Sequence, residues 1–428
     1  MTTLNTYSKY SPVIYDYAKQ LPDGWQLLPN IAIFQERIER GFENEELLSV
    51  TIGRGVIKQT DLDKKDSSTL DKSKYLLVYS GDLVYSMRFR QGASGYSNYK
   101  GIVSPACTVL KPRKGVIFNS RYYYYMFRTE FYKNYVERYA YGIADGQMPL
   151  RYVDFKRMYS IFPPLEVQNS IIDYLDKINS DINKFIRNKE RLIELLEEEK
   201  KSVIIKSVIN GIDNVELANF GNEWIGFLPK HWEIKRNKLL FRKTKNIVGS
   251  KSSDYKVLSL SVNGVIERDL ESNFGKMPTT FDDYQVIYPD TLLMCLFDID
   301  VTPRGIGYVR QVGITSAAYT NLIKIDKNIN LEYYYYWFLA LDFNKRLLQF
   351  ATNLRNTVLM DVFGALYSPY PPIIEQGEIV KHIKFEVSKI DVAIRNAKKE
   401  ISSIKEYRDA LITDLVTGKR SVPQLQIK

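Results

Sequence analysis

The chain contains 428 residues, of which 45% are apolar and 26% are charged, and its formal net charge is +10. A chain of this length and composition is expected to fold around two hydrophobic cores, which excludes disordered and fibrous proteins. Its apolar stretches fall far short of the ~20 residues of a membrane span. Residues 1–20 also lack the basic-then-apolar pattern of a signal peptide, so we expect a cytoplasmic protein.

The first clear elements are strands. Residues 75–79 and 83–85 are rich in Tyr, Leu and Val and are separated by Ser-Gly-Asp, a pattern typical of strands joined by a turn. The aromatic run at residues 122–139 predicts a helix whose tyrosines pack against a sheet rather than stack on bases. We therefore expect an N-terminal segment over residues 1–20 and a first domain of mixed strands and helices over residues 21–165.

A long helix is predicted over residues 166–212. Apolar residues recur at alternating steps of four and three, which is the heptad pattern of a coiled-coil seam. Two prolines precede the helix, and Gly211 is expected to end it because glycine tolerates the left-handed conformation of a helix stop. The predicted seam consists of Ile171, Leu175, Ile178, Ile182, Phe185, Lys189, Leu192, Leu196, Glu199 and Val203.

The second half of the chain repeats the first. The Leu-Pro-x-x-Trp segment at residues 21–25 returns at 228–232, and the four tyrosines at 122–125 return at 333–336. The repetition predicts one fold used twice, and the differences between the copies suit the reading of two different sequences. An old duplication without any twofold use is the alternative.

A second domain is therefore predicted over residues 213–372, followed by a second long helix over 373–418 and a tail over 419–428. The two helices are expected to pair as an antiparallel coiled coil with pseudo-twofold symmetry, because a tethered partner has a higher effective concentration than another chain. The fold class is thus α+β, with two tandem mixed α/β domains. The second seam consists of Val380, Ile383, Val387, Ile390, Ile394, Ala397, Ile401, Ile404, Arg408, Leu411 and Leu415.

The positive charge is concentrated. Residues 83–129 contain eight Lys or Arg and no acidic residue, and residues 235–245 contain six Lys or Arg. These cations alternate with Tyr, Ser, Asn, Gln and Gly, the residues that contact phosphates and base edges. The pattern favours a nucleic-acid partner over a merely solvated basic face.

Patterns of known chemistry are missing from the sequence. The two histidines and the two cysteines lie in different settings, and no Gly-x-x-x-x-Gly-Lys-Ser/Thr occurs. The Glu-x-Lys at residues 198–200 is assigned to the charged face of the first long helix. We expect no catalytic residue, no metal site and no cofactor in this chain.

Two motifs carry a family resemblance. Residues 222–232 read Asn-Glu-Trp-Ile-Gly-Phe-Leu-Pro-Lys-His-Trp, and residues 371–376 read Pro-Pro-Ile-Ile-Glu-Gln. They resemble the specificity subunit of type I restriction-modification enzymes, in which Glu-Trp-x-Gly-x-x-Pro-x-x-Trp opens a recognition domain and Pro-Pro-x-x-Glu-Gln opens a conserved helix. The first half departs from both patterns: Val167 stands where the helix motif has Glu, and nothing before Leu21 matches Trp224 and Gly226.

The resemblance implies a non-catalytic DNA-reading subunit of a restriction and DNA-modification system. Each of two target recognition domains would read one half of a bipartite, asymmetric sequence in double-stranded DNA. The helix pair would set the spacer and bind two methyltransferase subunits, which bring S-adenosylmethionine and methylate adenine. Separate restriction and translocase subunits would bring ATP and Mg.

Candidate DNA contacts come from basic and polar loops at matching places in the two halves. Arg can donate to two acceptors of guanine, Gln and Asn can pair with adenine, and Lys and Tyr more often contact phosphates. In the first half the candidates are Arg88, Arg90, Gln91, Ser94, Tyr96, Lys100, Gln147 and Arg151. In the second half they are Thr302, Arg304, Tyr308, Arg310, Asn353, Arg355 and Asn356.

Two other functions are compatible with the sequence: a stand-alone DNA-binding regulator with a coiled coil, and a cryptic nuclease or methyltransferase. A regulator should bind operator DNA by itself and an enzyme should act by itself. A specificity subunit should instead need its methyltransferase partners.

Overall fold

The computed structural model describes residues 5–13, 18–62, 71–139, 150–213, 215–270, 278–352 and 354–423. It divides into two compact units, with residues 1–189 and 399–428 in unit 1 and residues 190–398 in unit 2. We call the part of unit 1 that precedes residue 165 domain 1, and residues 211–372 of unit 2 domain 2. Among the described residues, every helix is too short or too polar to span a membrane.

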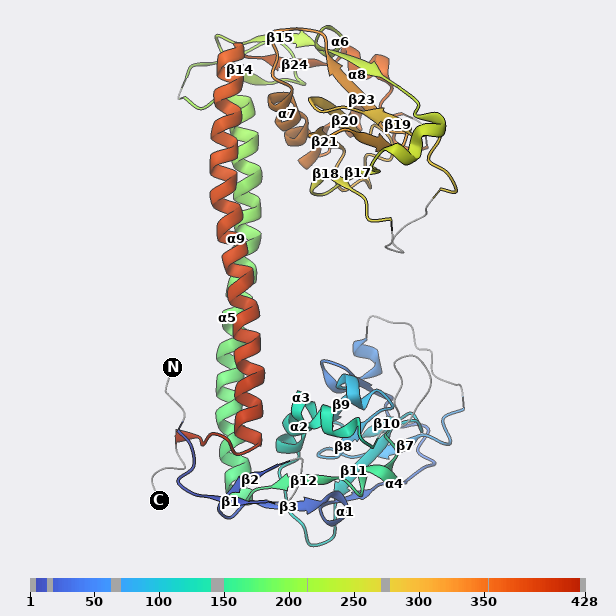
Figure 1. Ribbon diagram of the computed structural model, residues 1–428, viewed down its shortest axis with the longest axis vertical. Helices are drawn as coiled ribbons and strands as arrows, with labels where there is room; N and C mark the ends of the chain where they lie inside the picture. The colour runs from blue at the N-terminus through green and yellow to red at the C-terminus, as the bar shows by residue number, and fades with distance from the viewer. Residues whose placement is uncertain are drawn as a thin grey trace. The chain divides into compact units, whose positions relative to one another are not determined.

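Domain 1 is built around an antiparallel sheet of four short strands in the order β4-β11-β8-β9 (Figure 1). The central strand β8 is buried at all three residues, and the central strand β11 is buried at its first three. The sheet strands are β4 (Phe34–Glu36), β8 (Leu83–Tyr85), β9 (Ser94–Tyr96) and β11 (Thr108–Pro112).

Four two-stranded pairs complete the strands of domain 1. They are β1 (Tyr10–Pro12) with β2 (Gln20–Pro22), β3 (Gln26–Pro29) with β12 (Tyr159–Phe162), β5 (Leu48–Thr51) with β6 (Gly55–Lys58), and β7 (Leu76–Val78) with β10 (Gly101–Val103). The two strands predicted at residues 75–85 are confirmed as β7 and β8. They belong to different sheets, because β7 pairs with β10 while β8 lies between β11 and β9.

The helices of domain 1 are short: α1 (Asn30–Ile33), α2 (Ser120–Arg128), α3 (Glu130–Val136) and α4 (Tyr152–Phe155), with 3-10 turns η1 (Gln59–Asp61) and η2 (Phe89–Gln91). The single aromatic helix predicted at residues 122–139 is wrong. Thr129 is extended between α2 and α3, and its hydroxyl accepts the N–H of Tyr132, so it caps the second helix. The packing role of the tyrosines is confirmed, because Tyr122, Tyr123 and Tyr132 are fully buried.

Domain 2 repeats this topology, with the four-stranded order β16-β23-β20-β21 (Figure 1). Its strands are β13 (Leu217–Asn219), β14 (Phe227–Pro229), β15 (Glu233–Arg236), β16 (Phe241–Thr244), β17 (Leu258–Ser261), β18 (Gly264–Glu267), β19 (Gln285–Ile287), β20 (Thr291–Met294), β21 (Ile306–Val309), β22 (Gly313–Thr315), β23 (Thr320–Lys324) and β24 (Tyr367–Tyr370). Its helical segments are α6 (Asn237–Leu240), η3 (Gly249–Asp254), α7 (Leu331–Phe343), η4 (Arg346–Phe350) and α8 (Met360–Ala365). The expected duplication of one fold is therefore confirmed.

Each domain is followed by a long helix, α5 (Leu165–Asn210) or α9 (Ile373–Val416). Both helices begin directly after a Pro-Pro pair, and both are followed by a glycine with positive φ, Gly211 or Gly418. Left-handed backbone at these positions favours glycine, as the sequence predicted.

The seam of α9 is buried or half-buried throughout, as predicted. In α5, every second predicted position after Ile182 is replaced by the next residue, while Lys189, Leu196 and Val203 are half-buried as predicted. Phe185 and Leu192 are 37% and 40% exposed, whereas Ile186 is 8% exposed. Ile193 and Lys200 likewise replace Leu192 and Glu199 on the half-buried side. An α-helix has 3.6 residues per turn rather than the 3.5 of a strict heptad, so a strict heptad pattern drifts by ~20° per heptad and some of its positions rotate gradually out of the interface.

The predicted antiparallel pairing of the long helices is found in each unit. In unit 1, Ile171 and Leu175 of α5 share a hydrophobic cluster with Leu411 and Leu415 of α9. Lys189, further along α5, forms an ion pair of 2.6 Å with Glu400. The sequence positions therefore rise along one helix as they fall along the other.

Unit 2 has the same arrangement. Lys200 of α5 forms an ion pair of 2.7 Å with Asp391 of α9. Further along α5, Ile204 and Val208 share a cluster with Ile379 and Ile383. Apolar contacts thus join the helices near both of their ends, and ion pairs lie on either side of the division between the units.

A buried glutamine at the start of each long helix shows how far the duplication extends. Gln168 donates to the carbonyl of Pro163 (2.8 Å) and accepts the N–H of Asn119 (2.9 Å). Gln376 donates to the carbonyl of Pro371 (2.8 Å) and accepts the N–H of Asn330 (2.7 Å). Both side chains are 0% exposed, so the repeat preserves individual hydrogen bonds as well as topology.

Candidate nucleic-acid interface

The candidate contacts of domain 1 lie mainly on the connection between β8 and β9, which contains η2. Arg88 is exposed, whereas Arg90 is half-buried and its Nε donates to Glu137 Oε1 at 2.5 Å. Gln91 is exposed at the end of η2. Ser94 is only 2% exposed, so its burial leaves almost no surface for a ligand.

The remaining candidates of domain 1 are more scattered. Tyr96 packs edge-on against Tyr124, with ring centroids 5.5 Å apart, and Lys100 forms an ion pair with Glu45. Arg151 is exposed directly before α4. Gln147 lies outside the described residues.

In domain 2 the earlier loop is the connection between β20 and β21. The Thr302 hydroxyl donates to the carbonyl of Asp298 (2.7 Å), which directs it toward its own loop, while Arg304 is half-buried. Tyr308 donates to Asp290 Oδ1 (3.0 Å), and Arg310 forms an ion pair of 2.7 Å with Glu332. Partial burial and the carboxylate of Asp290 together raise the pKa of Tyr308 to about 12, so this hydroxyl stays protonated at neutral pH.

The structure brings the later loop of domain 2 against the earlier one. The N–H of Asp298 donates to the carbonyl of Arg355 (2.6 Å), and the Arg355 guanidinium donates to both carboxylate oxygens of Asp298 (3.1 and 2.5 Å). Asn356 follows at a positive φ of 41°. Asn353 lies outside the described residues.

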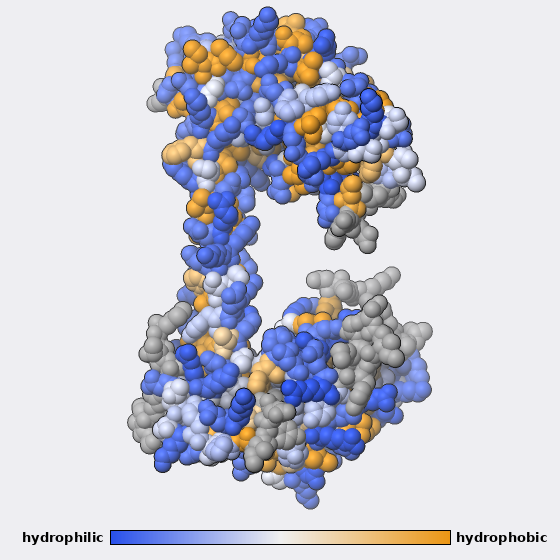
Figure 2. All heavy atoms as spheres, viewed as in Figure 1, coloured by the Kyte–Doolittle hydropathy of each residue, from blue (hydrophilic) through white to orange (hydrophobic). Residues whose placement is uncertain are grey.

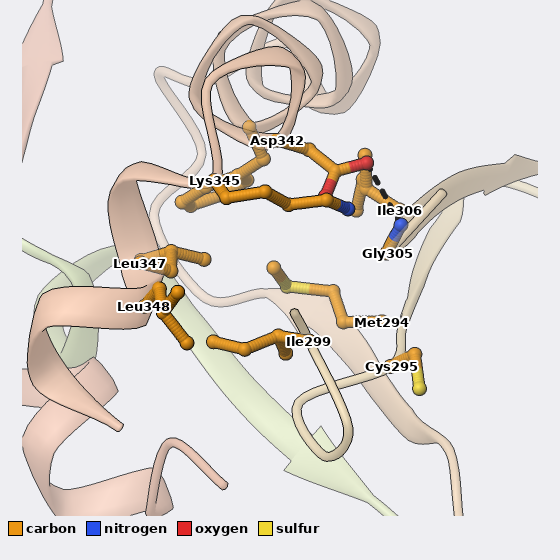
Figure 3. Close-up of a pocket in the computed structure, with 10 residues that line it drawn as sticks. Met294, Cys295, Ile299, Gly305, Ile306, Asp342, Lys345, Leu347 and Leu348 are labelled. Atoms are coloured by element: carbon orange, nitrogen blue, oxygen red, sulfur yellow. Dashed lines mark hydrogen bonds and ion pairs between the residues drawn. The ribbon is translucent and has the colours of Figure 1, made fainter. Parts of the chain in front are cut away.

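A small cavity lies behind the β20–β21 connection, and Figure 3 shows the residues around it. Its volume is about 20 Å³ and most of its lining is apolar, including Met294, Ile299 and Leu347. The Asp342 carboxylate accepts the N–H of Gly305 (2.8 Å), the interaction drawn as a dashed line in Figure 3. A space of this size suits packing rather than the binding of an organic ligand.

Lys345 also anchors the β20–β21 connection through hydrogen bonds. Its ammonium donates to the carbonyl of Thr302 (2.6 Å) and to Asp342 Oδ1 (2.7 Å). The loop is thus fixed at Thr302 and at Gly305 by side chains from the end of α7 and the residues after it. A fixed base lets the loop present its outer side chains in one geometry.

Sequence reasoning missed Asp298, Phe297 and Lys345, which position the two loops of domain 2. Asp298 could have been noticed as a carboxylate inside an otherwise basic and polar loop. Its pairing with Arg355, 57 residues later, depends on the tertiary structure. Within the described ranges, no group of three or more His, Cys, Asp or Glu side chains is placed to hold a metal ion.

Comparison with known proteins places these loops in context. Residues 48–195 match the family model of the type I restriction modification DNA specificity domain. Residues 48–195 therefore carry a DNA specificity domain of the type I restriction-modification kind. The expected resemblance is therefore confirmed, and the protein is a DNA specificity subunit, a non-catalytic component of such systems.

Solved structures support the same fold for the whole chain. A chain from a study of complex assembly and conformational transition of the type I R-M system matches with a TM-score of 0.66 at 13% identity, covering 93% of this chain and 99% of that one. The HsdS subunit from Thermoanaerobacter tengcongensis matches with a TM-score of 0.53 at 13% identity, covering 95% and 99%. No curated protein matches this specificity subunit. In its family, cofactors generally reside on the modification and restriction subunits.

Proposed function

We propose that each domain of this specificity subunit reads one half of a bipartite, asymmetric DNA target. The observation that supports this division is the contrast between the two copies of one fold. The buried hydrogen bonds of Gln168 and Gln376 are the same in both. The loops differ instead: the connection between β8 and β9 presents Arg90 in domain 1, and the equivalent connection between β20 and β21 presents Asp298 in domain 2. One scaffold with two different loop surfaces suits two different half-sites.

The recognition domains are proposed to span residues 21–165 and 213–372, with the conserved helices over 166–212 and 373–418. The N-terminal segment of residues 1–20 and the tail of residues 419–428 flank them. The proposed DNA contacts are the candidate residues of the two loop sets. Among these, Ser94 has the weakest support because it is buried. Arg90→Ala and Arg304→Ala should each relax one half-site only.

The helix pair is proposed to set the spacer between the half-sites and to dock two methyltransferase subunits. Those partners would bind S-adenosylmethionine and methylate adenine, and restriction and translocase subunits would use ATP and Mg. This chain's own part would be to bind and orient DNA. Because the proposed target is DNA, we place the assembled complex in the cytoplasm.

The ruler role has a direct test. The 46 residues of α5 correspond to about 69 Å of helix at ~1.5 Å per residue, or about two duplex turns of ~34 Å. Deleting one heptad from each helix, residues 191–197 and 393–399, would keep the seams in phase and shorten the pair by about 10 Å. Methylated adenines would be mapped in cells that express the chain with its methyltransferase partner.

We expect the spacer to shorten by about three base pairs while both half-sites stay the same. An unchanged spacer in an active complex would rule out the ruler. A matched control replaces the two heptads with heptads of equal length and similar composition, and should leave the spacer unchanged.

Expression of the chain with and without its methyltransferase partner also distinguishes a specificity subunit from a stand-alone regulator. A regulator would bind a defined operator without any methyltransferase subunit. The specificity subunit should direct methylation only when it is expressed with that partner.

A further inference from the structure

The tip of the later loop in domain 2 has the construction of a base-reading element. Thr352 and Thr357 close it through two backbone hydrogen bonds of 2.9 and 2.8 Å. Between them, Leu354 is fully exposed and the Arg355 side chain is 66% exposed. An apolar side chain that gains nothing from the core, next to an exposed arginine, is the combination found where proteins touch both base edges and thymine methyl groups.

The guanidinium of Arg355 is held in a fixed orientation. Its Nε and Nη2 donate to the two carboxylate oxygens of Asp298, at 3.1 and 2.5 Å. Its plane lies over the ring of Phe297, with Cζ 4.9 Å from the ring centroid. Phe297 in turn stacks on Tyr319, with centroids 6.2 Å apart and an interplanar angle of 19°. An arginine oriented on one side by a carboxylate and on its face by an aromatic ring loses little conformational entropy when it binds.

This orientation leaves the end of the guanidinium unused. Asp298 occupies the side formed by Nε and Nη2, and among the described residues Nη1 makes no hydrogen bond. The outward N–H groups of Nη1 and Nη2 form a planar fork, which matches the adjacent O6 and N7 acceptors of guanine in the major groove.

Asp298 is itself positioned by the fold. It has a positive φ of 48°, and its carbonyl accepts the N–H of Thr302 (2.9 Å) and the hydroxyl of the same residue (2.7 Å). Lys345 donates to the carbonyl of Thr302, so the loop that contains Asp298 is also fixed to the segment after α7. The chain thus fixes Asp298, and Asp298 fixes Arg355.

We infer that Arg355 reads a guanine in the half-site of domain 2, and that Asp298 is the positioning residue that aims it. The inference rests on the proposed function, because it names the base-reading group of the same interface. Phosphate binding by Arg355 is the competing role that the experiment distinguishes.

The test uses the complex of the full chain with its methyltransferase partner. The target is first mapped from methylated adenines, and duplexes carrying it are then made with 7-deazaguanine at one guanine at a time, which removes only the N7 acceptor. We expect one position to weaken binding by the wild-type complex about 10-fold or more. Arg355→Ala should weaken binding to the normal duplex by about 10- to 100-fold and abolish the effect of 7-deazaguanine at that position.

Two further variants separate reading from charge. Arg355→Lys keeps the cation but cannot form the fork, so it should bind as weakly as Arg355→Ala, whereas it would restore binding if the contact were to phosphate. Asp298→Asn should weaken binding by a smaller factor and at the same guanine only. Lys256→Ala removes another exposed cation of domain 2, which pairs with Glu267 at 2.7 Å, and serves as the matched control.

Three results would overturn the inference: an equal loss by Arg355→Ala on every duplex, recovery by Arg355→Lys, or a mapped target in which no guanine responds to N7 removal. Failure of the proposed function looks different. In that case the wild-type complex would methylate no defined sequence, whatever residue stood at position 355.

Discussion

Domain 1 and domain 2 pack against their long helices through ion pairs of opposite polarity. In unit 1, Arg121 near the start of α2 forms a bidentate ion pair with Asp176 of α5. In unit 2, the equivalent place near the start of α7 holds Glu332, which pairs with Lys384 of α9 at 2.5 Å. The contact is kept while its polarity is reversed.

Buried contacts at the same junctions are not reversed. The hydroxyl of Tyr122 donates to the carbonyl of Val416 (2.7 Å), and that of Tyr333 donates to the carbonyl of Val208 (3.1 Å). A buried polar group must keep its partner because an unsatisfied one costs ~1–3 kcal/mol. An exposed ion pair contributes at most ~1 kcal/mol, so its residues can change as long as the two charges change together.

The largest expected effect comes from breaking the repeated buried contact. Gln168→Leu and Gln376→Leu each remove a donor and an acceptor from a buried site, so each should lower the free energy of unfolding of its unit by ~2–4 kcal/mol. Hydrogen–deuterium exchange of the amides at the start of α5 and α9 measures the two units separately.

Exposed Gln349, which donates to the carbonyl of Arg346, provides the control: Gln349→Leu should change exchange little. A large loss in one unit with none in the other would contradict the view that both copies depend on the same buried contact.

The next largest effect concerns the helix starts, where unit 2 has Glu375 and unit 1 has Val167. Glu375 accepts the indole N–H of Trp232 (2.9 Å) and contacts His231 Nε2 (2.9 Å), whereas Val167 stands at the equivalent position in unit 1. Glu375→Val leaves the indole N–H of Trp232 without its acceptor and should destabilise unit 2 by ~1–3 kcal/mol.

Three of the four tryptophans, Trp224, Trp232 and Trp337, lie in unit 2, so tryptophan fluorescence during urea unfolding reports mainly on that unit. The matched variant Val167→Glu adds a carboxylate to the helix start of unit 1, where Trp25 matches Trp232 but Gly24 stands in place of His231, and should not stabilise unit 1. Stabilisation by Val167→Glu would mean that the two helix starts are interchangeable.

A smaller effect is expected from the ion pairs of reversed polarity. Arg121→Glu places two carboxylates together and should destabilise unit 1 by up to ~1 kcal/mol, because both side chains are more than a third exposed and solvent screens them. The double variant Arg121→Glu with Asp176→Lys adopts the polarity of unit 2 and should recover most of that loss. Thermal unfolding at low and high salt measures both, and the difference should shrink at high salt.

The smallest effect concerns the titration of Asp298. Its hydrogen bonds with Arg355 hold the pKa of this carboxyl below its usual value of 3.8. A depressed carboxyl pKa means that the pair is fully formed above the ordinary pKa and is lost as pH falls through the lowered one. Arg355→Ala should therefore raise the pKa of Asp298 toward 3.8, which carboxyl carbon NMR can follow. An unchanged titration would show that the pair does not form in solution.

Much of the fold could be predicted because it depends on patterns among residues that are close together in the sequence. The duplicated segments, the Pro-Pro helix starts and the glycines after the helices each have a physical cause in neighbouring residues. The break at Thr129 could not be seen, because Tyr122 and Tyr132 both suit a helix and only packing decides where it is interrupted.

The candidate interface was predictable only in part. Basic and polar loops could be located, but the sequence did not show that Ser94 would be buried or that Asp298 would meet Arg355. Contacts between residues far apart in the chain depend on how strands are ordered in a sheet, and local patterns carry little information about that order.

The sequence by itself determined that one fold is used twice, that each copy ends in a long amphipathic helix, and that the helix pair has a heptad-like period. Tertiary structure decided which of two neighbouring residues enters the seam after Ile182, and it buries Ile186 rather than Phe185, in the direction that the 3.6-residue turn favours. It also decided which exposed charges meet. Periodicity and turn chemistry act between neighbouring residues, whereas the pairing of Arg355 with Asp298 exists only after two loops have been brought together by the same sheet.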